Sequence, residues 1–428
     1  MSKKIIYYTD RNFLTIPQLA ILDEETKRSI HVIAQVLPFR VNNYVLDSLI
    51  DWNNIPEDPI FQLTFPQRGM LEEAYYTEIY DLLYPEASPK EELKKAIFRI
   101  RSALNPHPSG QQQLNVPQLD DKPVDGIQHK YRETILFFPA KGQVCHSYCT
   151  FCFRWAQFVG DKDLMFKSSD RDQLKQYLIN NQQVTDVIFT GGDPMLMKTS
   201  AIKPYFELLL DPELDHIQNI RIGTKALTYW PYRFTEDEDA AALLDLFRQL
   251  IHRGKHVAFM AHFNHYSEVM APETQTASAK VLETGAVIRT QAPVLKHINN
   301  DPRVWETMWR EQTRLGMVPY YMFVERDTGA KNYFEIPLID AFAIYRGAIT
   351  KLSGLSRTVR GPVMSATPGK VEILGVDTVS DEKVFLARLI QSRDPNDSYK
   401  PFYIKYDDQA TWWEQLKPAF GADKFFFE

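Results

Sequence analysis

The sequence lacks the features that mark membrane, secreted and nucleic-acid-binding proteins. No apolar run approaches the roughly 18 to 20 residues of a membrane helix, and the start, MSKKIIYYTDRNF, has no signal-peptide core or cleavage site. Basic residues are not in excess, because 49 Lys and Arg against 55 Asp and Glu leave a net charge of −6. Nucleic acids and anionic membranes bind basic surfaces, so we expect neither as a partner. These absences predict a cytoplasmic protein.

Cysteine is rare in this sequence, and its positions are informative. The 428-residue chain has three, Cys145, Cys149 and Cys152, all within eight residues. An odd number argues against a disulfide framework, and cysteines that serve only as small buried hydrophobes would be scattered along the chain. The spacing therefore predicts a shared chemical role. The remaining composition, 44% hydrophobic and 24% charged, is ordinary for a globular protein and excludes extensive disorder.

Hydrophobic patterning divides the chain into three regions. Residues 1–130 are mostly helical and loop-rich, with helices expected at 16–37 and 88–104. Residues 131–360 alternate between strands and helices, which favours parallel β/α units. Residues 361–428 are β-rich and predict a small C-terminal sheet. The strands of the middle region are expected at 134–138, 186–190, 220–224, 256–262, 286–291 and 318–325, and its helices near 170–181, 199–210, 236–252, 273–284, 302–315 and 336–353. Six such units would make an incomplete barrel rather than a closed eight-stranded one.

The cysteines follow the first of these strands, where barrel proteins build their sites. Thiolates are soft ligands that suit iron–sulfur clusters or zinc. Zinc takes four ligands in a structural site, or three and an open position in a catalytic one, so His146 or His129 would serve as a further ligand. Three cysteines with x3 and x2 spacing and no fourth favour a [4Fe–4S] cluster with one open iron.

The pattern Cys145-x3-Cys149-x2-Cys152, with Phe151 before the third cysteine, resembles the signature of radical S-adenosylmethionine (SAM) enzymes. In that family the open iron chelates the amino and carboxylate groups of SAM, and electron transfer releases a 5′-deoxyadenosyl radical. The resemblance therefore implies a [4Fe–4S] cluster held by the three cysteines, SAM as a cofactor, and an electron donor as a partner.

Further segments between about 52 and 375 are similar to the lysine 2,3-aminomutase branch of these enzymes. The similarity implies an α/β fold: a partial (β/α)6 radical SAM barrel with an N-terminal helical wrap and a small β-rich C-terminal extension. It also implies an isomerase that moves an amino group between C2 and C3 of an amino acid, with pyridoxal 5′-phosphate (PLP) carrying the nitrogen. The similar segments are Trp52–Pro59, Gly126–Tyr131, Cys152–Arg154, Thr190–Pro194, Arg221–Thr224, His262–His265 and Gln291.

By this resemblance, several strand-end residues contact SAM. Gly191 and Gly192, which precede Asp193 in one segment, would receive its amino group, because glycines let a ligand approach the backbone. His262 would contact the adenosyl group and Gln291 the carboxylate region. The competing interpretation is a tight turn for the glycines and satisfied structural polar groups for the other two.

The resemblance also implies residues for PLP and the substrate. Arg154, a planar fork suited to carboxylates, would hold the substrate carboxylate, although a surface ion pair is the alternative. Tyr131 would lie against the pyridoxal ring unless it is a core tyrosine. Lys370 ends a shortened run, Pro368-Gly369-Lys370, and is the candidate Schiff-base lysine, with a surface lysine as the alternative. Lys130 and Arg132 would pair with the phosphate.

The chain departs from the family where the distal end of lysine would bind. There the lysine enzyme uses two aspartates, whereas the corresponding positions here are Arg326 and a site near Ala366. A buried ammonium without carboxylates is costly, so an acidic or neutral substrate side chain suits Arg326 better than free lysine. Glu325 or Asp327 would restore lysine binding only by a one-residue shift.

Two other functions stay open from the sequence. One is a PLP-independent radical SAM enzyme that abstracts hydrogen from another substrate, and the other is a non-catalytic metal-binding protein. The sequence also leaves open a homo-oligomer. The segment 376–428, with Trp412 and Trp413, is expected to be a docked tail rather than a subunit contact, because exposed aromatic residues usually find cover.

Overall fold

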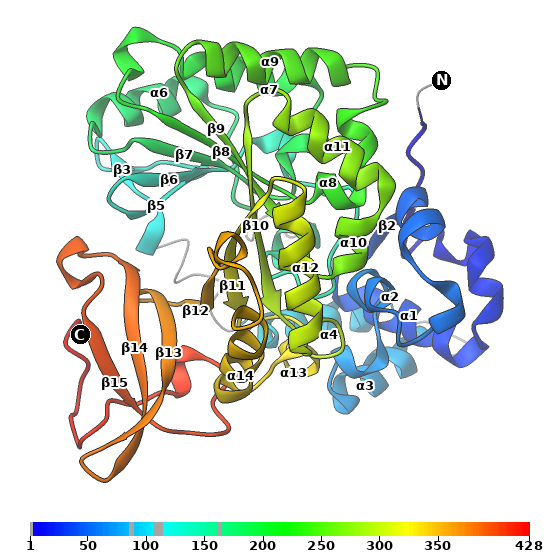
Figure 1. The fold of residues 1–428 in the computed structure, drawn as a ribbon. Coiled ribbons are helices and arrows are strands. Elements are labelled where there is room, and N and C mark those ends of the chain that lie inside the picture. The colour runs from blue at the N-terminus through cyan, green and yellow to red at the C-terminus, as the bar shows by residue number, and fades with distance from the viewer. Residues whose placement is uncertain (1–2, 85–89, 106–113, 161–164) are drawn as a thin grey trace.

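The computed structural model of the chain describes residues 3–84, 90–105, 114–160 and 165–428. Six parallel strands, each followed by a helix, form its middle (Figure 1). The strand and helix predictions for this region are confirmed to within a few residues. The strands are β6 Thr134–Phe137, β7 Asp186–Phe189, β8 Asn219–Thr224, β9 His256–His262, β10 Val287–Val294 and β11 Val318–Val324, and the helices are α6 Arg171–Asn180, α7 Thr199–Leu208, α9 Ala240–His252, α11 Pro272–Leu282, α12 Pro302–Arg314 and α14 Leu338–Ile349.

Alternate residues of these strands face different surroundings, as the period of two in a strand requires. One set is fully buried against the helices and includes Phe137, Phe189 and Phe259. Aromatic contacts continue outward from the strands, with Phe189 4.9 Å from Phe206 of α7 and Phe259 5.3 Å from Phe247 of α9 between ring centroids. The other set lines a cavity on the opposite face: Leu136, Ile188, Arg221, Gly223, Met260 and Gln291.

The C-terminal region is β-rich, as the sequence predicts, but its strands join the main sheet instead of forming a small sheet of their own. Strand β12 (Arg360–Ser365) pairs in parallel with β11, and β13 (Gly369–Val379), β14 (Glu382–Ser392) and β15 (Pro401–Lys405) follow in antiparallel pairing, so all four extend one 11-stranded sheet. The opposite edge is β5 (Ile127–Tyr131), antiparallel to β6. The pairing partner of a strand is set by distant residues, which the local pattern does not encode.

The last residues dock on the chain's own sheet, as predicted. Trp412 and Trp413 are 4% and 7% exposed. The Trp413 ring lies 6.3 Å from that of Phe402 on β15 and 4.9 Å from that of Phe425. Burial of these rings against β15 fixes the tail beside the cavity that Trp412 helps to line.

The N-terminal region forms its own helical core against the middle of the molecule. Its helices are α1 Glu24–Val36, α2 Pro59–Thr64, α3 Glu73–Leu83 and α4 Lys90–Ala103. The helix expected at 16–37 begins only at Glu24, because Asp23 caps it through a hydrogen bond from the Thr26 amide, and Pro17–Ile21 forms a 3-10 turn. The remaining short elements are β1 Tyr7–Thr9, β2 Arg40–Asn42, β3 Gln118–Leu119, β4 Lys122–Pro123, α8 Ala226–Tyr229, α10 Tyr266–Met270 and α13 Lys331–Phe334.

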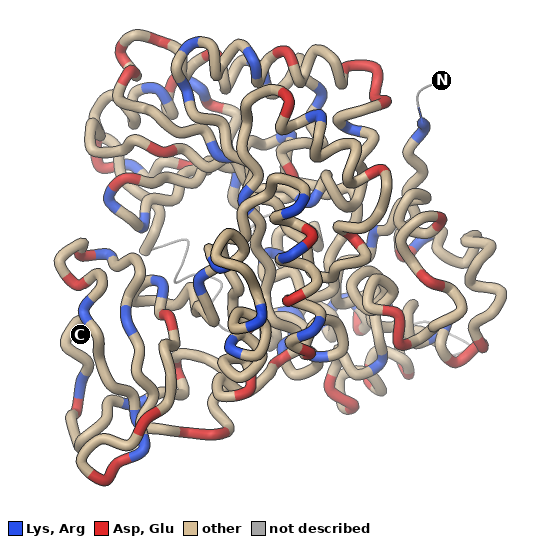
Figure 2. The backbone as a smooth tube through the Cα atoms, in the orientation of Figure 1, with Lys and Arg blue, Asp and Glu red and all other residues tan. Residues whose placement is uncertain are grey.

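Charges of both signs are distributed along the whole chain (Figure 2). Among the described residues, no helix combines the length and apolarity needed to cross a membrane.

Candidate active site

One cavity, of about 420 Å3, gathers the residues that the sequence singles out. They come from the ends of the parallel strands, from the loop that carries the cysteines (residues 143–154, the cysteine loop) and from β5 and β13. Arg132 and His129 are absent from its described lining. The residues brought together are Lys130, Tyr131, Cys145, Cys149, Cys152, Arg154, Gly191, Gly192, Asp193, His262, Gln291 and Lys370.

The N-terminal region holds the cysteine loop by its backbone. The Tyr148 amide donates to the Arg40 carbonyl at 2.8 Å, and the Thr150 amide donates to the Leu63 carbonyl at 2.9 Å. The Asn42 side chain, which is fully buried, donates to the His146 carbonyl at 3.0 Å. These contacts fix the loop in place. No sequence motif indicates these contacts, because most are hydrogen bonds between main-chain groups, which every residue has.

The glycine pair packs against the cysteine loop. A Cβ at Gly191, whose φ is +137°, would lie 2.1 Å from Nε2 of Gln143, and a Cβ at Gly192 would lie 2.4 Å from the Val144 nitrogen. Gly191 therefore favours glycine through its positive φ, and Gly192 requires glycine because a Cβ there would meet the main chain of the cysteine loop. This packing is a physical reason for the pair whether or not a ligand also reaches it.

The three thiols are desolvated. Burial raises the pKa of each, and that of Cys152 reaches about 12. A thiolate at this place therefore needs a positive partner, which a bound metal supplies. Cys149 has one side-chain hydrogen-bond partner, the Tyr229 hydroxyl, 3.4 Å from its sulfur.

The histidines named as further zinc ligands differ in position. His129 is engaged elsewhere, with Nδ1 2.5 Å from the Tyr177 hydroxyl and Nε2 3.1 Å from the Arg132 carbonyl. His146 does line the cavity, and burial lowers its pKa to about 3. Within the described part of the chain, no three His, Cys, Asp or Glu side chains are placed to hold one metal ion together.

The Asp193 carboxylate is engaged in hydrogen bonds with neighbouring residues. Its carboxylate accepts from the Thr224 hydroxyl at 2.7 and 2.9 Å, from the Lys225 amide at 2.9 Å and from the Met195 amide at 2.9 Å. Burial raises its pKa to about 6. Asp193 thus links the segment after β7 to the end of β8, and both segments line the cavity.

His262 and Gln291 contact each other. They are paired residues on neighbouring strands, and Nε2 of Gln291 lies 2.9 Å from Nε2 of His262. Burial, together with the nearby Lys225 and Arg154 cations, lowers the pKa of His262 to about 3. The imidazole is therefore neutral near pH 7 and accepts a hydrogen bond from the amide.

Arg154 offers a charged group to the cavity. Its guanidinium carbon lies 4.4 Å from the centroid of the Phe138 ring and 5.1 Å from that of Phe153. Burial lowers its pKa to about 10, which leaves it cationic at pH 7. Among the described residues it forms no ion pair. The surface ion pair considered from the sequence is thus not observed, and a buried cation of this kind favours an anionic ligand.

Two lysines approach the Tyr131 ring. Nζ of Lys130 lies 5.5 Å and Nζ of Lys370 5.6 Å from its centroid, and Lys370 also lies 4.5 Å from the Tyr321 centroid. Desolvation lowers the pKa of both lysines to about 7, helped for Lys370 by Arg221 and Lys130. Lys130 donates to the carbonyl of Ala366, which joins β5 to the β12–β13 turn.

The distal part of the cavity contains polar groups without partners. Both side-chain oxygens of Glu325, which is 7% exposed, and Nε of Arg326 are buried and have no hydrogen bond within the described residues. Burial raises the pKa of Glu325 well above its usual value. The Arg326 guanidinium lies 5.6 Å from the Trp412 ring, so the C-terminal tail closes this end.

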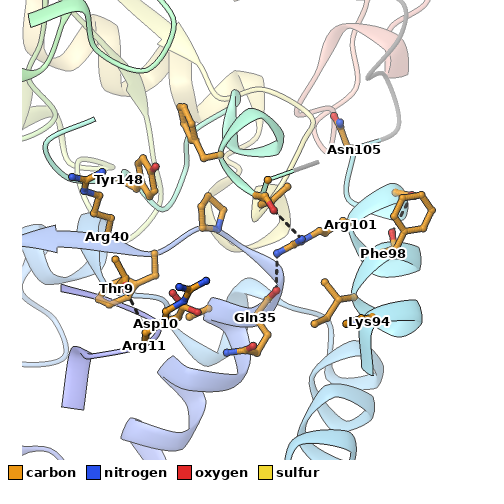
Figure 3. A pocket seen from close by; sticks show the side chains of 18 residues that line it. Thr9, Asp10, Arg11, Gln35, Arg40, Lys94, Phe98, Arg101, Asn105 and Tyr148 are labelled. Atoms are coloured by element: carbon orange, nitrogen blue, oxygen red, sulfur yellow. Dashed lines mark hydrogen bonds between the residues drawn. The ribbon is translucent and has the colours of Figure 1, made fainter. Parts of the chain in front are cut away.

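A second hollow, of about 1000 Å3, lies between the N-terminal region and the cysteine loop (Figure 3). Its described lining includes Arg11, Arg40 and Arg101, together with Tyr148, whose ring stacks on Phe158 at 4.7 Å. None of the cysteines lines it. The sulfur atoms therefore belong to the smaller cavity on the sheet.

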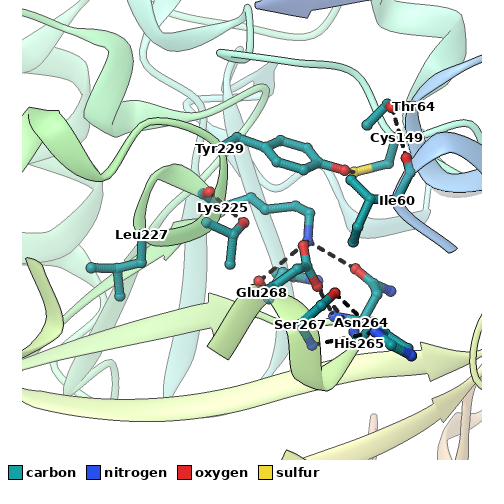
Figure 4. A network of polar contacts seen from close by, with 12 residues as sticks. Ile60, Thr64, Cys149, Lys225, Leu227, Tyr229, Asn264, His265, Ser267 and Glu268 are labelled. Carbon is teal, nitrogen blue, oxygen red and sulfur yellow. Dashed lines mark hydrogen bonds and ion pairs between the residues drawn. The ribbon is translucent and has the colours of Figure 1, made fainter. Parts of the chain in front are cut away.

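A polar network borders the cavity beside Cys149 (Figure 4). Nζ of Lys225 donates to Glu268 at 2.5 Å and to Oδ1 of Asn264 at 3.0 Å, and it lies 4.5 Å from the centroid of the Tyr229 ring. Glu268 is fully buried. The sequence analysis missed these residues. Their only signal is that Lys225 directly follows the strand-end segment Arg221–Thr224.

Comparison with known proteins was made by sequence and by structure. A putative L-lysine 2,3-aminomutase of Aquifex aeolicus is 30% identical over 415 residues, which is 97% of this chain and 96% of that protein. An L-lysine 2,3-aminomutase of Acetoanaerobium sticklandii is 24% identical over 65% of this chain and 63% of its own length, and a glutamate 2,3-aminomutase of Clostridioides difficile is 27% identical over 47% and 44%. No family model matches the sequence. Among solved structures, Streptococcus suis SuiB bound to the precursor peptide SuiA aligns with a TM-score of 0.36 and 13% identity over 61% of this chain and 51% of that one.

The similarity to the Aquifex protein extends over nearly the full length of both chains, so it includes the N-terminal region, the β/α units and the C-terminal strands. The three-cysteine loop and the strand-end residues that carry the resemblance lie together in one cavity. The chain belongs to the lysine 2,3-aminomutase family of radical SAM enzymes and is an aminomutase-like isomerase.

Proposed function

We propose that this enzyme moves an amino group between C2 and C3 of an amino acid, using a [4Fe–4S] cluster, SAM and PLP. The observation that carries the proposal is one cavity in which three half-buried cysteines, a half-buried arginine with no ion pair among the described residues, and a half-buried lysine of lowered pKa converge. When bound, the cluster and SAM supply a 5′-deoxyadenosyl radical, and PLP supplies the group that carries the migrating nitrogen.

The donor set fits a cluster better than a single zinc ion. A structural zinc site takes four ligands, whereas the sequence offers three cysteines, and His129 is engaged with Tyr177 and Arg132. A four-iron cluster takes one thiolate per iron at separate corners. Cys145, Cys149 and Cys152 would hold three irons.

The residues near β13 fit PLP. Lys370 keeps a large neutral fraction near pH 7, as covalent attachment to an aldehyde requires. Tyr131 presents its ring between Lys130 and Lys370, where it would lie against the pyridine ring. Lys130 and Arg393, which both line the cavity, would attract the phosphate. Arg132, named for this task from the sequence, lies outside the described lining.

Arg154 would orient the substrate by its carboxylate, because it lines the cavity, is cationic and forms no ion pair among the described residues. His262 and Gln291 would contact SAM as a mutually fixed pair, and Gly191 and Gly192 would leave room for its amino group. Asp193 would act by positioning the strand ends. The docked C-terminal tail, through Trp412, would limit the access of water to the distal end.

The substrate is proposed to have an acidic or neutral side chain rather than that of free lysine. Arg326 places an unpaired guanidinium Nε at the distal end, beside Lys130 and Arg393. Burial favours the neutral form of Glu325, which is a poor counter-ion for an ammonium group. The relative named glutamate 2,3-aminomutase is consistent with an acidic amino acid. Turnover of lysine in preference to glutamate or aspartate would refute this part.

The fold is proposed to be a partial (β/α)6 barrel, since six parallel β/α units run from β6 to β11. The regions 1–130, 131–360 and 361–428 would then act as a helical wrap, a radical-generating barrel and a PLP-binding extension.

The test begins with anaerobic purification, iron and sulfide analysis, and reduction by dithionite in the presence of SAM. About four irons per chain and release of 5′-deoxyadenosine support the cluster and SAM. Amino acids are then screened with and without PLP, and β-amino acid formed only with PLP supports the isomerase. Lys370→Ala should abolish it. An unchanged rate in that variant would instead favour the PLP-independent reaction, and a colourless zinc protein would refute the whole proposal.

A further inference from the structure

Cys149 differs from the other two cysteines in its surroundings. The Tyr229 hydroxyl lies 3.4 Å from its sulfur. Among the described residues, neither Cys145 nor Cys152 has a side-chain hydrogen bond to its sulfur. Tyr229 is 1% exposed, so water does not compete with this contact. This contact therefore distinguishes the Cys149 sulfur from the other two.

The direction of this hydrogen bond follows from chemistry. A free thiol and a phenol can each donate, but a cysteine bound to iron is a thiolate and has no proton to give. The phenol must then donate to sulfur. A hydrogen bond donated to a cluster sulfur stabilises negative charge there, and hydrogen bonds of this kind are among the factors that set reduction potential.

The tyrosine is held from two sides. Its carbonyl accepts from the Asn42 side chain at 2.8 Å, and the same amide nitrogen donates to the His146 carbonyl in the cysteine loop. Behind the ring lies Nζ of Lys225, 4.5 Å from the centroid, paired with the buried Glu268 (Figure 4). The backbone and the ring of Tyr229 are therefore both fixed relative to Cys149.

We propose that Tyr229 is a positioning residue of the cluster: its hydroxyl donates a hydrogen bond to the Cys149 sulfur and raises the reduction potential, while Lys225 and Glu268 hold the ring in place. This inference rests on the proposed [4Fe–4S] cluster and goes beyond the proposed reaction. Reduction adds negative charge to the cluster, so the bond is stronger in the reduced state.

The test is an electrochemical titration of reconstituted Tyr229→Phe, monitored by the electron paramagnetic resonance of the reduced cluster. This substitution removes only the hydroxyl. The ratio of reduced to oxidised cluster at a fixed ambient potential should fall about three- to tenfold, and tenfold corresponds to about 59 mV for one electron. A merely structural role would lower cluster content without moving the potential.

Tyr232→Phe is the matched control. Tyr232 is buried three residues further on, in a ring contact with Trp230 and away from the cysteines, and its variant should keep the wild-type potential. An unchanged potential in loaded Tyr229→Phe would overturn the inference while leaving the proposed function intact. Absence of a cluster from the wild-type protein would overturn both, so the two failures are distinguishable.

A second measurement covers the case in which Tyr229→Phe does not retain a cluster. The reduced wild-type enzyme is examined by electron–nuclear double resonance in H2O and D2O, with ring-deuterated tyrosine as a label. An exchangeable proton coupled to the cluster and close to a labelled ring supports the hydrogen bond. The absence of such a proton refutes it.

Discussion

Gln291 lies 2.9 Å from His262, nitrogen to nitrogen, across neighbouring strands. The register that pairs Gln291 with His262 also points both side chains into the cavity. Because the histidine is neutral and its Nε2 accepts, the amide decides which way the imidazole is turned. Two residues that the sequence names separately thus form one unit, in which each fixes the other before a ligand arrives.

The first prediction concerns this pair. Gln291→Leu keeps the approximate volume but removes the donor, so the imidazole loses its orientation. A hydrogen bond of this kind contributes about 0.5–1.5 kcal/mol, and SAM affinity of the reconstituted enzyme should therefore fall about three- to tenfold. Equilibrium dialysis measures it, with Gln249→Leu on the exposed face of α9 as the control. Equal affinity in Gln291→Leu and wild type would show that the pair does not position SAM.

The second prediction concerns the glycine against the cysteine loop. In Gly192→Ala the added Cβ would meet backbone atoms of Gln143 and Val144 at 2.4–2.7 Å. Backbone cannot yield as a flexible side chain does, so unfolding free energy should fall by about 1–3 kcal/mol, and the displaced loop should bind less iron.

The control is Gly354→Ala, whose Cβ meets nothing within 4 Å and should stay within about 0.5 kcal/mol of wild type. Urea unfolding and iron analysis measure the two effects. A wild-type iron content together with wild-type stability in Gly192→Ala would contradict the packing.

The third prediction is that the buried His265 makes the folded protein less stable at acidic pH. Burial lowers the pKa of His265 to about 4, whereas the usual pKa of histidine is about 6.5. Between these values the unfolded chain binds a proton that the folded chain does not, so stability falls as the pH drops from about 6.5 to 4. One histidine contributes at most about 1.4 kcal/mol per pH unit.

His265→Asn keeps a residue able to cap α10, since His265 accepts from the Ser267 amide as its N-cap. Its unfolding free energy should change less between pH 6.5 and 4.5 than that of the wild-type protein. His252→Asn, on the exposed end of α9, should not differ from wild type in this slope. Parallel slopes for His265→Asn and wild type would contradict the assignment.

The sequence predicts what local pattern and spacing encode. The strands from β6 to β11 carry a period of two or a continuous apolar run, and the cysteine spacing is a chemical signature. The structure confirms the strands, and it places the three cysteines in the lining of one cavity. The start of α1 was predicted wrongly, because a 3-10 turn can share a helical pattern. The pairing of β12 with β11 was not predicted, because two helices separate these strands in the chain.

Around the cysteines, too, some residues can be found from a sequence motif and others only from the fold. Arg40 and Leu63 hold the cysteine loop by main-chain carbonyls, which leave no mark in a sequence. Lys225 directly precedes the short helix α8 and Tyr229 ends it, and nothing in the sequence distinguishes them until the fold places Glu268 and Cys149 beside them. Residues that bind a cofactor follow a motif, whereas the residues that position them are found only once the distant segments meet.

The fourth prediction concerns the reactivity of Lys370. Burial and the neighbouring Arg221 and Lys130 cations lower its pKa to about 7. An amine reacts with an aldehyde only in its neutral form, so the rate of imine formation with added PLP should rise about tenfold for each pH unit below 7 and level off above it. Absorbance of the imine measures the rate between pH 5.5 and 8.5. Lys370→Ala should abolish this phase, whereas Lys203→Ala on the exposed face of α7 should retain it. A rate that continues to rise up to pH 8.5 would mean that an ordinary surface lysine, with its pKa near 10.4, is the one that reacts.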